Sequence, residues 1–110
     1  MTGEHRRPVV HVDPIGADLE PLPGETIIEA AWRLGYRWPT ACHGQATCAA
    51  CHIEVISGTE HLTPPDEEER ATIEDRLPRR QDPTRFRLAC RAQATGNVTV
   101  RKTGVRREPR

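Results

Sequence analysis

The sequence predicts a small α+β domain in which two helices are set among short β-strands. Runs of alternating apolar and polar residues lie near both ends of the chain, and two segments between them carry helix-capping residues. A chain of 110 residues with 35% hydrophobic and 4% aromatic residues leaves room for one domain with a small core. Such a core would benefit from a covalent or metal cross-link.

The first part of the chain predicts a β-hairpin followed by a helix. Residues 9–12 (VVHV) alternate as a strand, a turn follows at Asp13, Pro14 and Gly16, and a second short strand is expected at residues 19–22. Thr26 and Glu29 have the spacing of a capping box, and Gly35 suits the end of a helix. We therefore expect a helix over residues 27–34.

The second part predicts a loop, a strand, an acidic helix and two final strands. Residues 40–50 are small and lack a period, and residues 52–56 alternate as a strand. Thr63 is a candidate N-cap with Pro64 in the first turn, so a helix is expected to run to about residue 77. Residues 86–90 and 97–101 complete the order β-β-α-loop-β-α-β-β, and residues 1–7 and 102–110 are expected to be tails on a domain of residues 8–101.

Charge and hydropathy exclude several classes of partner. The 16 basic and 16 acidic residues cancel, which gives no reason to expect nucleic acid or an anionic membrane as partner. No apolar run reaches the roughly 18 residues that span a bilayer, and the N-terminus lacks the apolar core of a secretory signal. We expect a bacterial cytoplasmic protein that acts as a monomer.

Four cysteines form the sharpest pattern in the sequence. Cys42, Cys48 and Cys51 lie within ten residues, and Cys90 follows after a long gap. Small residues between them, including Gly44, Ala46 and Thr47, let backbone N–H groups approach thiolates and inorganic sulfide closely. The spacing favours an iron–sulfur cluster, whereas structural zinc more often uses two C-x2-C pairs, and disulfides do not suit an unexported protein.

The segments CHGQATCAACHIEV and RLACRA resemble the [2Fe-2S] ferredoxins of the adrenodoxin and putidaredoxin type. The resemblance covers roughly residues 9–101 and implies the β-grasp (ubiquitin-like) ferredoxin fold and one-electron transfer, without substrate chemistry of its own. It implies that Cys42 and Cys48 bind the iron nearer the surface and that Cys51 and Cys90 bind the inner iron. It also implies a flavoprotein ferredoxin reductase as donor and a cytochrome P450 or other oxygenase as acceptor.

An acidic segment is the candidate docking surface. Residues 60–75 carry seven acidic residues against Arg70, and in the resembled family the matching helix docks on basic surfaces of its partners. The candidate docking residues are Asp66, Glu67, Glu68, Glu69, Glu74 and Asp75. A solvated helix face that binds nothing is the alternative interpretation.

Two features depart from the resembled family or invite a separate role. His43 lies where the family often has a small or acidic residue, and a protonatable group there would make the potential depend on pH. The residues after position 82 are strongly basic, whereas family members are usually acidic. His52 directly follows Cys51, and we expect it to clamp the loop to the sheet rather than bind metal.

Three other functions remain open at this point. The same cluster would serve in iron–sulfur cluster biosynthesis, or would report redox state in a regulatory module that uses the basic C-terminal segment. Zinc in place of the cluster would make the chain a binding module without redox chemistry. We expect no enzyme activity, because the sequence shows no nucleophile with a base and no phosphate-binding glycine loop.

Overall fold

The computed structural model describes residues 8–39, 50–77, 79 and 85–107, which form one mixed sheet, a two-stranded ribbon and two α-helices. The strands of the main sheet are β1 (Val10–Asp13), β2 (Ala17–Leu19), β4 (His52–Ser57), β5 (Phe86–Leu88) and β6 (Val98–Arg101). The helices are α1 (Ile27–Arg33) and α2 (Glu67–Arg76), with a 3-10 turn at Thr59–His61. The ribbon consists of β3 (Tyr36–Arg37) and β7 (Arg106–Arg107).

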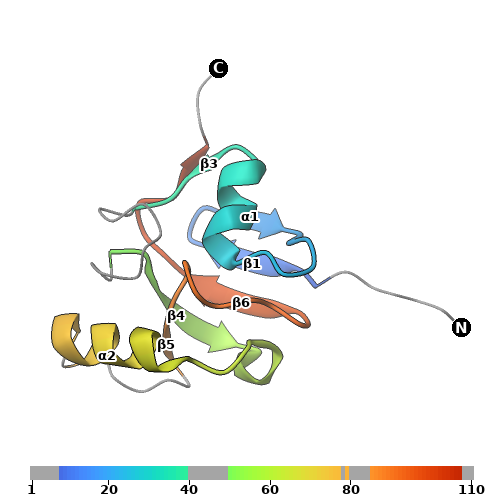
Figure 1. Cartoon of the computed structure of the whole chain (residues 1–110). Coiled ribbons are helices and arrows are strands. Elements are labelled where there is room, and N and C mark those ends of the chain that lie inside the picture. Colours follow the sequence, from blue (N-terminus) through green and yellow to red (C-terminus); the bar gives the residue numbers. More distant parts are fainter. Residues whose placement is uncertain (1–7, 40–49, 78, 80–84, 108–110) are drawn as a thin grey trace, which may run out of the picture.

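The main sheet has the strand order β2-β1-β6-β4-β5 (Figure 1). β1 and β6, which come from opposite ends of the chain, pair in parallel at its centre, and the remaining neighbours are antiparallel. Parallel neighbours need a long connection, and here the whole middle of the chain supplies it. The predicted α+β class, the hairpin and the central elements are confirmed, with β2 starting earlier than expected.

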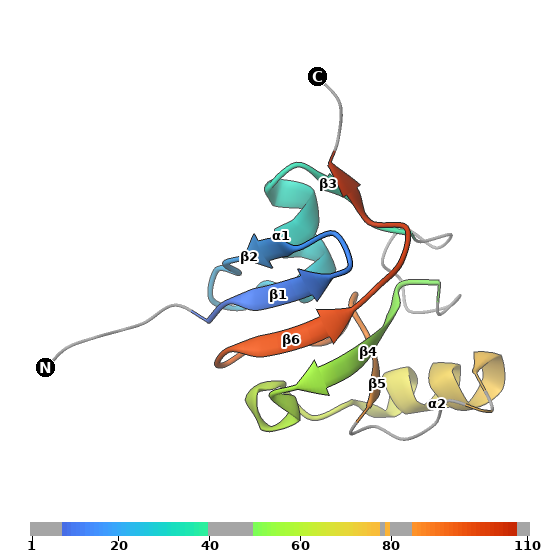
Figure 2. The same ribbon diagram turned by 180° about the vertical axis from the view of Figure 1, so that it is seen from behind.

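The core lies between the sheet and α1. The strands alternate buried and partly exposed residues, as a sheet with one covered face requires. Figure 2 shows the opposite face, on which no described helix lies. Buried strand residues form one hydrophobic cluster with Ile27, Ile28 and Ala31 of α1; they include Val10, Val12, Ile53, Val98 and Val100.

Helix α1 forms as the sequence predicts. The Glu29 N–H donates to the Thr26 hydroxyl at 3.3 Å, and the Thr26 N–H donates to the Glu29 carboxylate at 2.9 Å, which completes the capping box. Gly35 follows with φ 88°, the left-handed conformation that favours glycine after a helix. Ile27, Ile28, Ala30 and Ala31 are buried on the inner face of the helix.

Helix α2 starts three residues later than the Thr63 cap predicts. Asp66 is the N-cap, and its carboxylate accepts the Glu69 N–H at 2.7 Å. Thr63 instead pairs with the segment after β5, because its hydroxyl accepts the Gln93 N–H at 3.1 Å. Aspartate is at least as good a cap as threonine, and an anion there also suits the helix dipole.

The prediction of a tail from residue 102 onward is wrong for residues 102–107, which we call the C-terminal strap. Val105 is 7% exposed and belongs to the core, and β7 pairs antiparallel with β3. Lys102 is 9% exposed. Single apolar residues separated by polar ones leave no period in the sequence, although each can still fill a gap in a core.

Candidate metal centre

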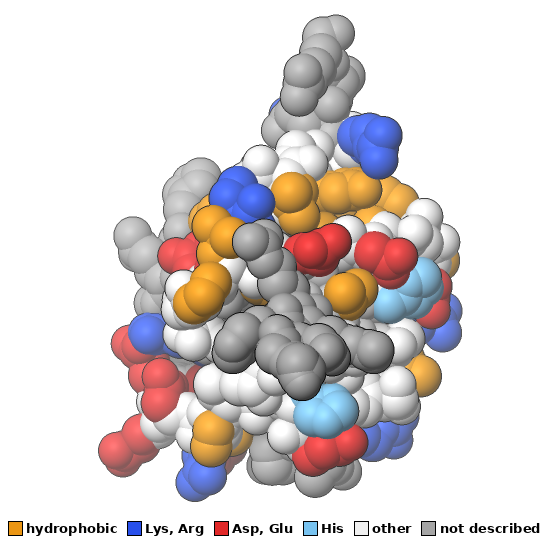
Figure 3. Space-filling view, turned by 90° about the vertical axis from the view of Figure 1, so that its right-hand side faces the viewer, with side chains coloured by type: hydrophobic (Ala, Val, Ile, Leu, Met, Phe, Trp, Pro, Cys, Tyr) orange, Lys and Arg blue, Asp and Glu red, His pale blue; other side chains and the backbone are white. Residues whose placement is uncertain are grey.

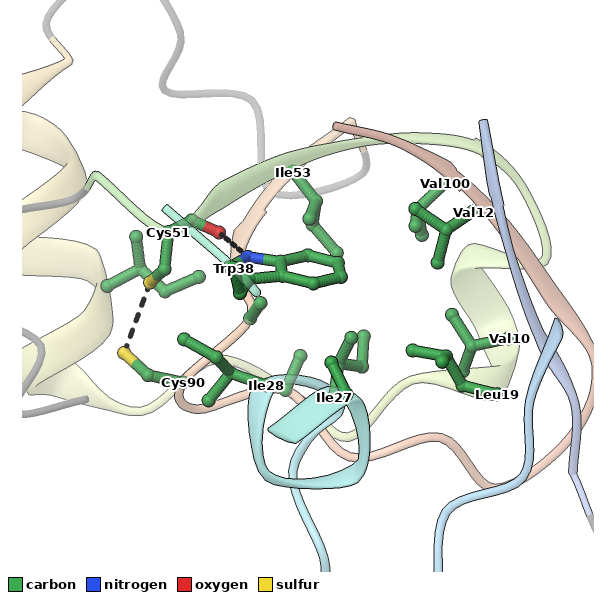
Figure 4. Close-up of a cluster of buried hydrophobic side chains, with 14 of the residues drawn as sticks. Val10, Val12, Leu19, Ile27, Ile28, Trp38, Cys51, Ile53, Cys90 and Val100 are labelled. Atoms are coloured by element: carbon green, nitrogen blue, oxygen red, sulfur yellow. Dashed lines mark hydrogen bonds between the residues drawn. The ribbon is translucent and has the colours of Figure 1, made fainter. Parts of the chain in front are cut away.

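Two of the four predicted ligand cysteines lie side by side at the edge of the core. Cys51 directly precedes β4 and Cys90 lies two residues after β5, and these two strands pair in the antiparallel sense. Cys51 is fully buried, Cys90 is 7% exposed, and their sulfur atoms are 3.3 Å apart (Figure 4). The fold therefore places Cys51 and Cys90, which are 39 positions apart in the chain, next to each other.

The distance between the two sulfur atoms fits metal ligation better than a covalent bond. A disulfide would hold the sulfur atoms about 2.05 Å apart. Two thiolates on one tetrahedral metal, each with a bond of about 2.3 Å, lie roughly 3.8 Å apart. At 3.3 Å the two sulfur atoms are too far apart for a disulfide between them, and a small movement would bring them to the separation of two ligands on one ion.

Backbone and indole donors hold the peptide at Cys51 in place. The Trp38 Nε1–H donates to the Cys51 carbonyl oxygen at 3.3 Å, and the Ala89 N–H donates to the same oxygen at 3.4 Å. Trp38 is 5% exposed and lies over the core beside Cys51 (Figure 4). Trp38 therefore packs in the core and also holds the Cys51 peptide by a hydrogen bond.

The segment that carries Cys90 is held by the start of α1. The Ile28 N–H donates to the Ala89 carbonyl and the Ile27 N–H donates to the Ala92 carbonyl, each at 3.0 Å. The first N–H groups of a helix lack partners within the helix. These two bonds therefore give acceptors to the helix N–H groups and donors to the two carbonyl oxygens. The apolar helix of the core therefore also positions the second thiol.

Arg91 follows Cys90 and connects the site to α2. Its guanidinium pairs with Glu68 and lies 3.9 Å from Asp66. Its Nε atom is buried and has no hydrogen-bond partner among the described residues. A buried donor without a partner is costly, and the pairs with Glu68 and Asp66 hold the Arg91 side chain against α2.

Glu69, which the sequence assigned to docking, is a buried structural residue. It is 1% exposed, its carboxylate accepts two hydrogen bonds from Arg87 at 2.7 and 3.0 Å, and it accepts the Leu88 N–H at 2.9 Å. The docking prediction is therefore wrong at this position, since a buried carboxylate cannot reach a partner. Ile73, four residues later on the same helical face and also buried, was the signal that would have found it.

Four of the other predicted docking residues, Glu67, Glu68, Glu74 and Asp75, are exposed on α2. Asp66 is exposed as well, although it caps the helix. On the face that Figure 3 shows, by contrast, side chains of both charge signs are interspersed. The acidic surface of α2 is thus a local feature of a formally neutral chain.

The rest of the predicted site lies outside the described residues. This applies to Cys42, Cys48, His43, Gly44, Ala46 and Thr47. Within the described part of the chain, no group of three potential metal ligands gathers, so that part contributes the Cys51 and Cys90 pair alone. His52 is half-buried at the start of β4, and its clamping role stays a prediction.

A mixed sheet crossed by one helix, with two thiols side by side at the same end of two neighbouring strands, defines a β-grasp domain with a candidate metal site. The chain belongs to the family of 2Fe-2S iron-sulfur cluster binding domains, whose model matches residues 10–95. It is 37% identical over 93 residues to the 2Fe-2S ferredoxin-5 of Aquifex aeolicus, which is 84% of this chain and 94% of the relative. The chain is an electron carrier with a [2Fe-2S] cluster, as its family indicates.

Two solved structures share both fold and sequence with the chain. The Amycolatopsis cytochrome P450 reductase GcoB has a TM-score of 0.68 and 28% identity, and the match covers 92% of this chain and 28% of the reductase. The ISC-like [2Fe-2S] ferredoxin FdxB from Pseudomonas putida has a TM-score of 0.65 and 28% identity, with 86% of this chain and 91% of FdxB covered. The predicted β-grasp ferredoxin fold is confirmed. No helix among the described residues is long and apolar enough to cross a membrane.

Proposed function

We propose that this chain passes single electrons from an NAD(P)H-dependent flavoprotein ferredoxin reductase to a cytochrome P450 or a similar oxygenase. We propose Cys42, Cys48, Cys51 and Cys90 as the cluster ligands and the bacterial cytoplasm as the location. The observation that carries the partner proposal is the likeness to a cytochrome P450 reductase, in which the matched part is 28% of a longer chain. Here the corresponding unit would serve as a separate carrier.

The described residues fit the cluster. When bound, the [2Fe-2S] cluster supplies one-electron chemistry and carries a charge of about −2 when oxidised and one unit more when reduced. Cys51 and Cys90 offer paired thiolates in a buried place, and the peptides beside them are held by Trp38, Ala89 and α1. Peptides held in this way keep the ligand geometry nearly constant when the cluster gains or loses an electron. This lowers the reorganisation energy of each electron transfer.

The exposed carboxylates of α2 are proposed to steer the partners. Glu67, Glu74 and Asp75 face solvent, and Glu68 joins them although it is paired with Arg91. A surface of one charge sign raises the encounter rate with an oppositely charged partner and does so less at high salt. The Arg91 contact joins this surface to the residue next to Cys90, so that a partner seated on α2 would lie close to the cluster.

A second function is favoured by a different observation. The ISC-like ferredoxin FdxB matches over 91% of its own length, which makes it comparable to this chain as a whole. Supplying electrons to iron–sulfur cluster biosynthesis is therefore the alternative. Both functions use the same site and differ in the acceptor.

A reoxidation experiment separates the two functions. The protein is reduced anaerobically and mixed either with a ferric cytochrome P450 under carbon monoxide or with a cysteine desulfurase and scaffold protein. Rapid formation of the ferrous carbon monoxide complex supports the oxygenase route. Electron delivery to the desulfurase and scaffold mixture alone would contradict that route and support the alternative.

A further inference from the structure

The C-terminal strap holds both flanks of the segment that carries Cys42 and Cys48. On one flank, β7 pairs with β3, and Gly104 lies so close to Pro39 that a Cβ atom there would be 3.0 Å from the proline Cγ. On the other flank, the Lys102 Nζ donates a hydrogen bond to the Ala50 carbonyl oxygen at 2.6 Å. Pro39 and Ala50 are the described residues that border residues 40–49.

Lys102 is unusual because it is a buried cation. It is 9% exposed, and lysine is almost never fully buried in proteins. The three cations that neighbour it along the chain, Arg101, Arg106 and Arg107, are all exposed. Removing an ammonium group from water is expensive unless the group is hydrogen-bonded or paired, and here the Lys102 ammonium donates to the Ala50 carbonyl oxygen, directly before Cys51.

We propose that Lys102 raises the reduction potential of the cluster by placing a buried positive charge beside the backbone that carries Cys51. The proposal rests on the proposed binding of the cluster by Cys51. It assigns a function to a residue that the sequence placed in a tail. The Lys102 side chain acts here through its charge and not as a ligand.

The physical basis is the extra negative charge of the reduced cluster. Covalent geometry keeps the Ala50 oxygen within roughly 6 Å of the Cys51 sulfur, so the Lys102 Nζ lies within roughly 9 Å of that ligand atom. This is less than the Debye length of about 10 Å at 0.1 M salt, and a buried charge is screened less than an exposed one. A nearby cation stabilises the more negative reduced state more than the oxidised state, and the potential rises.

The test compares variants that remove the charge at a buried and at an exposed position. K102Q and K102M remove the buried charge, K102R keeps it, and R101Q removes an exposed charge from the neighbouring residue. All proteins are poised with redox dyes at the midpoint potential of the unmodified protein, and the reduced fraction is read from the visible spectrum. In K102Q and K102M the ratio of reduced to oxidised protein should fall about tenfold, which is about 59 mV for one electron.

The controls decide between a charge effect and a packing effect. K102R should stay within about twofold of the unmodified protein, and so should R101Q, because an exposed charge is screened. An unchanged ratio in K102Q would overturn the proposal, and so would an equal fall in R101Q. Loss of the cluster in K102Q but not in K102R would also overturn it, since Lys102 would then hold the loop without setting the potential.

Iron and sulfide assays keep this inference separate from the proposed function. An unmodified protein without a cluster would contradict the proposed function itself. An unmodified protein and a K102Q protein with full clusters and equal potentials would overturn only the role of Lys102.

Discussion

The two helices are attached to the same sheet by opposite kinds of interaction. Helix α1 buries four apolar residues and uses its first N–H groups to hold the Cys90 segment. Helix α2 buries only Glu69 and Ile73, and an ion pair with Arg87 ties it to β5. Attachment through one buried carboxylate and one apolar side chain leaves the rest of α2 to carry exposed charge, whereas α1 buries four of its seven residues.

The largest expected effect is the loss of the anchor of α2. Glu69→Ala leaves the Arg87 guanidinium and the Leu88 N–H buried without their acceptor, and it should lower the free energy of unfolding by about 3–5 kcal/mol. Urea denaturation of the purified protein measures this. Glu67→Ala, two residues earlier on the exposed side, should stay within about 0.5 kcal/mol. Equal stability of the two variants would show that the ion pair does not anchor the helix.

The exposed carboxylates of α2 should affect the rate at which a reductase reduces the protein and leave its free energy of unfolding unchanged. Combining E67Q, E74Q and D75N removes three charges, and it should slow reduction by a flavoprotein reductase about tenfold at low salt, with little effect at high salt. Stopped-flow bleaching of the visible spectrum gives the rate. The control is E20Q, an exposed carboxylate that follows β2, at the opposite edge of the sheet from the β5 strand that α2 contacts. A triple variant with the unmodified rate at every salt concentration would rule out the docking role.

Removing one buried apolar group from α1 should lower the free energy of unfolding only slightly, because the attachment of this helix is spread over several apolar side chains. Ile28→Val removes one buried methylene and should cost about 1 kcal/mol. The same urea titration measures this value. A loss as large as that of Glu69→Ala would mean that α1 also depends on a single contact.

The smallest expected effect is a pH dependence of stability that comes from the Arg33 ion pair at the end of α1 and not from the exposed Arg76 ion pair of α2. The hydrogen-bonded Arg33 guanidinium, with Nε 2.9 Å from the carboxylate, holds the pKa of Glu25 below its ordinary value of 4.5. A lowered pKa in the folded state stabilises the fold above about pH 4.5, and this contribution is lost as the pH falls through the lowered value.

The melting temperature of R33Q should therefore fall below that of the unmodified protein at pH 6, and the two should converge toward pH 3. The control R76Q breaks the exposed Asp75 pair of α2, where the two atoms are 3.4 Å apart, and should change little. A difference between R33Q and the unmodified protein that stays constant down to pH 3 would contradict the role of the Glu25 pair.

The sequence predicts the elements whose signals are local. The capping box at Thr26, the glycine after α1 and the alternating strands all depend on neighbours within a few residues, and the structure contains them. The cysteine spacing and the resemblance predicted the cluster family for the same reason, since three of the four cysteines lie within ten residues. Short strands such as β3 and β7, with two residues each, carry no periodic signal.

The errors concern residues whose role depends on distant partners. Glu69 looks like its acidic neighbours until Arg87, eighteen positions away, is brought beside it. Lys102 looks like part of a basic tail until its Nζ reaches Ala50, fifty-two positions away. Pairings over such separations depend on the topology of the sheet, which charge composition does not encode.

The most direct test of the account is an anaerobic EPR spectrum before and after dithionite, with iron, sulfide and zinc assayed on the same sample. We expect about two irons and two sulfides per chain and an S = 1/2 signal that appears on reduction. The signal should be lost in C51S and in C90S, because both thiols are proposed ligands. A colourless, EPR-silent protein that contains zinc would contradict the account, and so would an unaltered signal in both serine variants.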